Sequence, residues 1–116
     1  MRYTFLLYTD PADLAHMGPE DWAEQQQAYG AYIGALKEVG VFVDTDWLQP
    51  VTTATPLTAK DGTQVVQDGP FAETKERLGG YFVIDVPDLD AAMEWAWKSP
   101  SAKTSKVEIR ASALEG

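Results

Sequence analysis

Two short segments of the chain are apolar on both faces of a β-strand, and this feature constrains the fold most. In residues 3–8 and 81–86, aromatic and aliphatic side chains point to both sides of the backbone. Large exposed apolar patches are rare on monomers, so such strands need cover on both sides. We therefore expect a sheet that is covered on each face.

Two helices are predicted between the strands. Residues 19–39 begin at Pro19 and end before Gly40, which suits a left-handed helix terminus. One face of this helix repeats at spacings of three and four and carries Trp22, Gln26, Tyr29, Ile33 and Leu36. Residues 89–98 follow Asp88, a capping residue, and Pro100 closes that helix.

The remaining segments complete a recognisable order. Strand-like stretches occupy residues 41–48 and 106–110, and residues 54–59 and 63–67 form a small hairpin around the turn at residues 60–62. Strand, helix, strand, hairpin, strand, helix and strand is the order of a ferredoxin-like split β-α-β fold. We expect one α+β domain over residues 1–116, with a four-stranded antiparallel sheet and two helices on one face.

The second face of this sheet lacks a cover within the chain. Another sheet from a second copy is the simplest cover, since two-fold homodimers are the commonest oligomers. We therefore expect a homodimer through the sheet face. The alternative is that Trp47, Leu48 and Phe71 fold back over that face.

Composition excludes several classes of function. Nine Lys and Arg against eighteen Asp and Glu give a net charge of −9, which argues against nucleic acid and anionic membranes as partners. The absence of cysteine excludes disulfides and thiol nucleophiles. No signal peptide or spanning segment is evident, so we expect a cytoplasmic protein. We also expect no cofactor.

A longer run resembles a known family. Residues 68–82, which read DGPFAETKERLGGYF, are similar to the DGPF-type proteins of the YCII-related family, and residues 84–92, 94–96 and 107–110 extend the match. The resemblance implies a ferredoxin-like fold assembled as a dimeric α+β barrel. It also implies a regulatory association, because some such proteins are encoded beside extracytoplasmic-function sigma factors. Other dimeric barrels are small enzymes, including muconolactone isomerases and cofactor-free monooxygenases.

The resemblance also bears on acid–base chemistry. Typical YCII-related members carry a His on the first helix, paired with an Asp as a proposed catalytic dyad, and that position falls near Tyr29 here. The chain therefore lacks the proposed base. Its one histidine, His16, lies in the loop before the helix without an adjacent carboxylate, so we favour a surface role over a general base. A single histidine also excludes a multi-histidine metal centre.

The segment 68–80 is the best candidate for lining a ligand pocket. Phe71 would supply an apolar wall, and Asp68 or Glu73 a polar anchor, although the same residues suit a purely structural turn. Glu108 and Arg110 alternate with Val107 and Ile109, which should pack under the helices. Arg110 would then clamp a carboxylate or enolate with Glu108 holding it, or the two would form an ordinary salt bridge at the strands or the dimer interface.

Two other groups of side chains have structural alternatives. Asp44 and Asp46 share one strand face and would form an acid/base pair or, with Asp68, a site for a hard cation, but we favour a solvated strand edge. The tryptophans at positions 22, 95 and 97 are expected to be helix packing groups.

Two functions follow from these observations. The first is a small-molecule-binding or regulatory accessory module linked to extracytoplasmic-function sigma factors. The alternative is a cofactor-independent dimeric-barrel enzyme, similar to a lactone isomerase or monooxygenase, that acts on a small anion through Tyr29, Asp68 and Arg110. Catalysis requires these three side chains to converge on one cavity.

Overall fold

The computed structural model describes residues 1–69 and 77–114. Its main sheet contains β1 (Arg2–Thr9), β2 (Phe42–Trp47), β5 (Arg77–Asp85) and β6 (Lys106–Ala111). The strands are antiparallel and lie in the order β2-β5-β1-β6. This order is that of the ferredoxin-like split β-α-β fold, so the predicted α+β class is confirmed.

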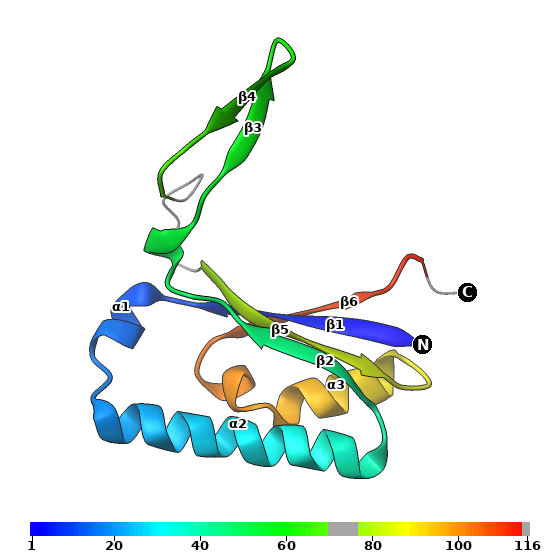
Figure 1. The fold of residues 1–116 in the computed structure, drawn as a ribbon. Coiled ribbons are helices and arrows are strands. Elements are labelled where there is room, and N and C mark those ends of the chain that lie inside the picture. The colour runs from blue at the N-terminus through cyan, green and yellow to red at the C-terminus, as the bar shows by residue number, and fades with distance from the viewer. Residues whose placement is uncertain (70–76, 115–116) are drawn as a thin grey trace.

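The two long helices lie under one face of the sheet (Figure 1). α2 (Pro19–Val39) and α3 (Leu89–Lys98) have the predicted bounds. The Gly18 amide donates to Asp21 Oδ2 at 2.9 Å before α2, and Gly40 ends that helix with φ of 83°. Asp88 caps α3 by accepting a hydrogen bond from the Ala91 amide at 2.9 Å.

Several elements differ from the sequence prediction, among them the first hairpin strand, which is predicted over residues 54–59 and is found at β3 (Leu57–Lys60). A third, short helix α1 (Pro11–Ala15) occupies the segment expected to be a loop, and the Asp10 side chain caps it through the Ala12 amide at 2.9 Å. β5 begins at Arg77 and not at Tyr81, since it stays paired with β1 as far as Arg77 and Thr9. Two short 3-10 helices, η1 (Val51–Thr53) and η2 (Pro100–Lys103), complete the described elements.

The hydrophobic core fills the space between the sheet and helices α2 and α3. Phe5, Leu36 and Ile84 are fully buried there. The surrounding buried side chains are Tyr3, Leu7, Tyr29, Tyr32, Phe82, Val86, Ala92 and Ala96. The Tyr32 hydroxyl donates to the Trp95 carbonyl oxygen at 2.7 Å, so the polar end of this buried ring is satisfied.

Within residues 1–69 and 77–114, no helix covers the opposite face of the sheet, and we call it the open face. The strand register aligns Leu6 with Tyr81 and Glu108, and Thr4 with Val83 and Arg110. The open face thus includes Arg2, Thr4, Leu6, Tyr8, Asp44, Asp46, Tyr81, Val83, Asp85, Lys106, Glu108 and Arg110. Val107 and Ile109 pack against the core, which confirms the predicted orientation of β6.

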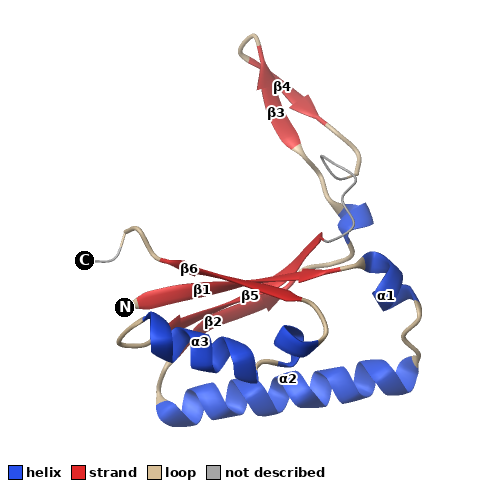
Figure 2. Cartoon of the chain, turned by 180° about the vertical axis from the view of Figure 1, so that it is seen from behind, coloured by secondary structure: helices blue, strands red, loops and turns tan. Residues whose placement is uncertain are grey.

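The predicted hairpin forms β3 (Leu57–Lys60) and β4 (Thr63–Val66), a separate two-stranded sheet. Its turn has positive φ at Asp61 (53°) and Gly62 (76°), as tight hairpin turns require. Together with its flanking residues it forms an arm, residues 54–69, that projects from one end of the main sheet (Figures 1 and 2). The arm leaves on the side away from the helices.

Candidate functional site

A cavity of about 570 Å³ lies at the end of the sheet from which the arm projects, and we call it the sheet-end cavity. It forms where the end of β1, helix α1, the first turns of α2 and the segment after β2 meet the start of β5. Its lining residues are Thr9, Pro11, Leu14, Ala15, Trp22, Gln25, Gln26, Trp47, Leu48, Gln49, Pro50, Val51, Thr52, Arg77, Leu78 and Gly79. Its size is that of an ordinary small-molecule site.

The lining of the sheet-end cavity is chemically simple. The indole rings of Trp22 and Trp47 supply flat apolar surface, and Gln25 and Gln26 supply carboxamides. Arg77 is the one ionisable side chain among the described residues that line it. The cavity therefore offers an apolar body, amide hydrogen bonds and one cation, but no general base among these residues.

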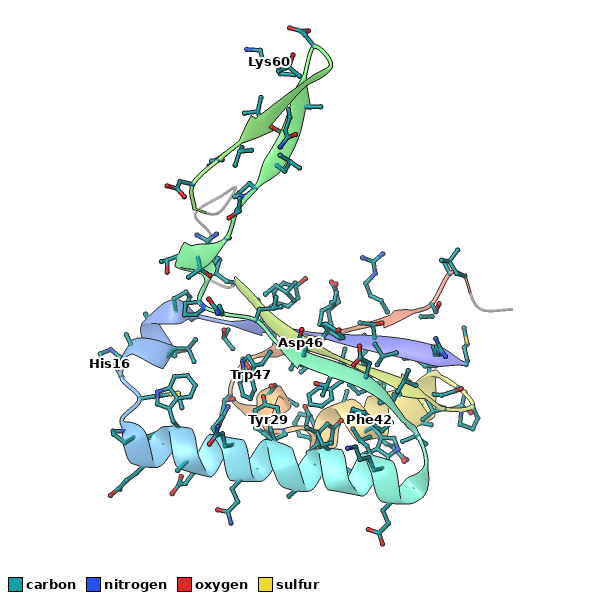
Figure 3. All side chains as sticks on the ribbon, in the orientation of Figure 1. His16, Tyr29, Phe42, Asp46, Trp47 and Lys60 are labelled. Carbon is teal, nitrogen blue, oxygen red and sulfur yellow. The ribbon has the colours of Figure 1, made fainter. Side chains whose placement is uncertain are left out.

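A smaller cavity of about 210 Å³, the inner cavity, lies between the sheet and α2. Its lining comprises Leu7, Tyr29, Ile33, Thr45, Asp46, Trp47, Gly80 and Phe82. Trp47 lines both cavities and stands next to Tyr29 (Figure 3). The two rings meet edge to face, with centroids 4.5 Å apart and an interplanar angle of 72°. This ring pair therefore lies where the two cavities adjoin.

The Tyr29 hydroxyl is hydrogen-bonded to the hydroxyl of Ser101, which is buried in η2. Burial raises the pKa of Tyr29 to about 12. The phenol therefore stays protonated near neutral pH, so it can take part in hydrogen bonds but cannot act as a general base.

The other predicted site residues lie elsewhere. Glu108 and Arg110 are exposed on the open face, on the other side of the sheet from Tyr29. Asp68 is exposed on the arm, after β4. None of these three lines either cavity, so Tyr29, Asp68 and Arg110 share no cavity among the described residues. Phe71 and Glu73 lie outside the described residues.

The acidic pair and the histidine have ordinary surroundings. Asp44 and Asp46 share the open face of β2 as predicted, and the Tyr81 hydroxyl donates to Asp44 Oδ2 at 3.0 Å. This hydrogen bond raises the pKa of Tyr81. His16 is exposed at the end of α1 and lines neither cavity. Within residues 1–69 and 77–114, no group of three His, Cys, Asp or Glu side chains is placed to hold a metal ion.

Trp22, Trp47 and Leu48 are the cavity residues that sequence reasoning missed. Trp22 is 42% exposed and so is not the predicted packing group; Trp97, at 65%, is not one either, whereas Trp95 packs against the core. Trp47 does not fold over the open face, because its ring packs on Tyr29 on the helix side. Four tryptophans in a short chain were the available signal, but only the fold brings two of them together.

Comparison with known proteins identifies the family of the chain. The family model of the YCII-related domain matches residues 1–112. The chain belongs to the YCII-related domain family. An uncharacterised protein of Rhizobium meliloti (strain 1021) is 34% identical to this YCII-related domain over 116 residues, which cover 98% of this chain and 94% of the relative. In the described part of this YCII-related domain, no helix has both the length and the apolar character needed to cross a bilayer.

Proposed function

We propose that this YCII-related domain binds a small molecule with a flat apolar body and one polar or anionic end in the sheet-end cavity. The observation that carries the proposal is the lining itself, in which Trp22 and Trp47 face a volume of about 570 Å³ together with Arg77. Aromatic walls recognise a planar apolar group, and a guanidinium recognises a carboxylate. Amide side chains from α2 would fix the orientation of the ligand.

The geometry favours binding over catalysis. An acid–base enzyme needs a titratable group within hydrogen-bond reach of its substrate. In the sheet-end cavity, Arg77 supplies a guanidinium, which is a cation and not a proton acceptor. In the inner cavity, the Tyr29 phenol keeps its proton near neutral pH. Asp46 also lines the inner cavity, but it shares the open face of β2 with Asp44, and its carboxylate accepts a hydrogen bond from the Trp47 amide at 2.8 Å. The regulatory association with an extracytoplasmic-function sigma factor stays a prediction from the family resemblance, and co-elution of the two purified proteins tests it.

Matched aromatic probes test the binding proposal. Benzoate and benzamide share a ring and differ in charge, and 1-naphthoate enlarges the ring. In ¹H–¹⁵N spectra of the wild type, we expect these probes to shift the indole N–H signals of Trp22 and Trp47 and to leave that of Trp97 in place. Trp22→Ala should weaken 1-naphthoate binding by about tenfold, the loss of one aromatic wall, while Trp97→Ala should leave it unchanged. Equal shifts at all four indoles, or none with any probe, would overturn the proposal.

We also propose that a second copy of the chain covers the open face. Leu6, Tyr8, Tyr81 and Val83 form an apolar strip there, and no helix in the described part of the chain covers it. Sheet-on-sheet packing would bury this strip against its own copy across a two-fold axis. Light scattering coupled to gel filtration should give twice the mass of 12.8 kDa, and a monomeric mass at micromolar concentration would reject the homodimer.

A further inference from the structure

The arm has more exposed apolar surface than a hairpin of a single chain would be expected to carry. All eight residues of β3 and β4 are exposed. Leu57 and Val66 face each other across the hairpin with 57% and 59% of their surfaces exposed. A two-stranded hairpin is marginally stable in water unless another element packs on it. The arm therefore lacks a packing partner within the described residues.

Hydrogen bonds hold the two sides of the arm together at its root, where residues 54–56 face residues 67–69. Pro56 is buried, the Gln67 amide donates to the Pro56 carbonyl at 2.9 Å, and the Gly69 amide donates to the Ala54 carbonyl at 3.1 Å. The radius of gyration is 16.2 Å, whereas about 13 Å is usual for a compact chain of this length. The exposed strands of the arm and the extended shape of the molecule indicate an element directed at another molecule.

The reach of the arm matches a second sheet. From residue 54 to the turn at residue 61, an extended chain spans about 24 Å. Two sheets that pack face to face are about 10 Å apart. An arm that leaves one end of the sheet on the side of the open face therefore extends past the plane of an opposing sheet (Figure 3, with Lys60 near the tip).

The charges of the open face favour a second copy as the opposing surface. The β2 edge carries Asp44 and Asp46, and the β6 edge carries the cations Lys106 and Arg110 around Glu108. Because β2 and β6 are the two edge strands, a two-fold axis parallel to the strands lays the acidic edge of one copy over the basic edge of the other. The surface is thus complementary to itself.

The same axis determines where the arm lies. Tyr8 pairs with Leu78 at the start of β5 and with Lys106 at the start of β6, so these residues lie at one end of the sheet. The arm projects from the same end (Figure 1). We infer that each arm clasps the second copy at this end and packs Leu57 and Val66 beside Tyr8 of that copy. This inference rests on the homodimer proposed above, but it adds a contact that the sheet faces alone do not require.

Mixed labelling tests the clasp without any substitution. Equal amounts of ¹³C-labelled and unlabelled wild-type chains are combined, and isotope-filtered NOEs are recorded between copies. We expect NOEs from the methyl groups of Leu57 and Val66 to aromatic protons of the unlabelled copy. Absence of these NOEs in a dimeric sample would overturn the clasp.

Paired variants give an independent test. Leu57→Ser/Val66→Ser changes exposed arm residues, and Val39→Ser/Leu89→Ser changes equally exposed apolar residues of the helix layer. By sedimentation equilibrium, we expect the arm variant to raise the dimer dissociation constant at least about tenfold and the control to leave it unchanged. An arm variant that dimerises as tightly as the wild type would reject the clasp and leave the homodimer standing. A monomeric wild type would reject both.

Discussion

The indole ring of Trp47 packs edge to face on the phenol of Tyr29, with the ring centroids 4.5 Å apart. Trp47 follows Asp46 at the end of an edge strand, and Tyr29 comes from the middle of α2. This contact lies where the inner cavity adjoins the sheet-end cavity, and it ties the free end of β2 to the helix layer.

Removing the indole should join the two cavities. Trp47→Ala is expected to lower the free energy of unfolding by about 1 kcal/mol, the size of an aromatic pair at a half-exposed position. It should also favour 1-naphthoate over benzoate more strongly than the wild type does, because the joined cavity is longer. Urea unfolding and titration with both probes measure these effects. Trp97→Ala is the control, and an equal loss of stability in both variants would contradict the role given to the ring pair.

The Arg77 guanidinium should determine the charge preference of the sheet-end cavity. Arg77→Gln is expected to weaken benzoate binding by about tenfold and to leave benzamide binding unchanged, since a charge-assisted hydrogen bond is lost only with the carboxylate. Isothermal titration of both probes provides the comparison. Equal weakening of benzoate and benzamide would instead indicate a change in the shape of the cavity.

The Tyr29 phenol should make folding sensitive to alkaline pH. Burial raises its pKa from 10.0 to about 12, so between these values the unfolded chain has lost a proton that the folded chain keeps. The contribution to stability is complete below pH 10 and falls as pH rises toward 12. Burial raises the pKa of Tyr32 in the same direction, so Tyr29→Phe should reduce this loss without abolishing it. Urea unfolding from pH 8 upward tests this, and identical profiles for the two proteins would be the contrary result.

Gly80 permits a close approach of two strands. A Cβ at this position would lie 2.7 Å from the main-chain oxygen of Asp46, so β2 and β5 would have to separate. Gly80→Ala should cost about 1–3 kcal/mol of stability, as other overpacked positions do. Gly34→Ala is the matched control, because nothing lies within 4 Å of its Cβ position in α2, and it should stabilise the protein by about 0.5–1 kcal/mol. Two losses of similar size would contradict this account.

The sequence predicts the scaffold well where local signals are strong. Pro19, Gly40 and Asp88 mark helix ends through backbone geometry and capping, and these ends are found as expected. α1 escapes prediction because five residues with Leu14 as the one large apolar side chain give no period. The strand predicted from Tyr81 extends back through Gly79 and Gly80 to Arg77, because this stretch pairs with β1 and Gly80 also pairs with β2.

The candidate site is harder to predict, because it depends on distant segments. Trp22 and Trp47 are separated by most of α2, and each alone is an ordinary large apolar residue. Arg110 has a chemistry suited to ligands, but strand alternation places it on the open face with Thr4. Spacing along the chain identifies a face of one element. It does not identify which elements enclose a cavity.

Among the residues that the structure describes, the sheet-end cavity and the hydrophobic core share none. The walls of the cavity are α1, the first turns of α2, the segment after β2 and the start of β5. The core lies between the middle of the sheet and the later turns of α2 together with α3. Apart from Trp47, whose ring packs on the core residue Tyr29, the wall residues can therefore be substituted without loosening the scaffold. Relatives with this fold are free to diverge in what they recognise, so fold likeness within the family is a poor guide to a shared ligand.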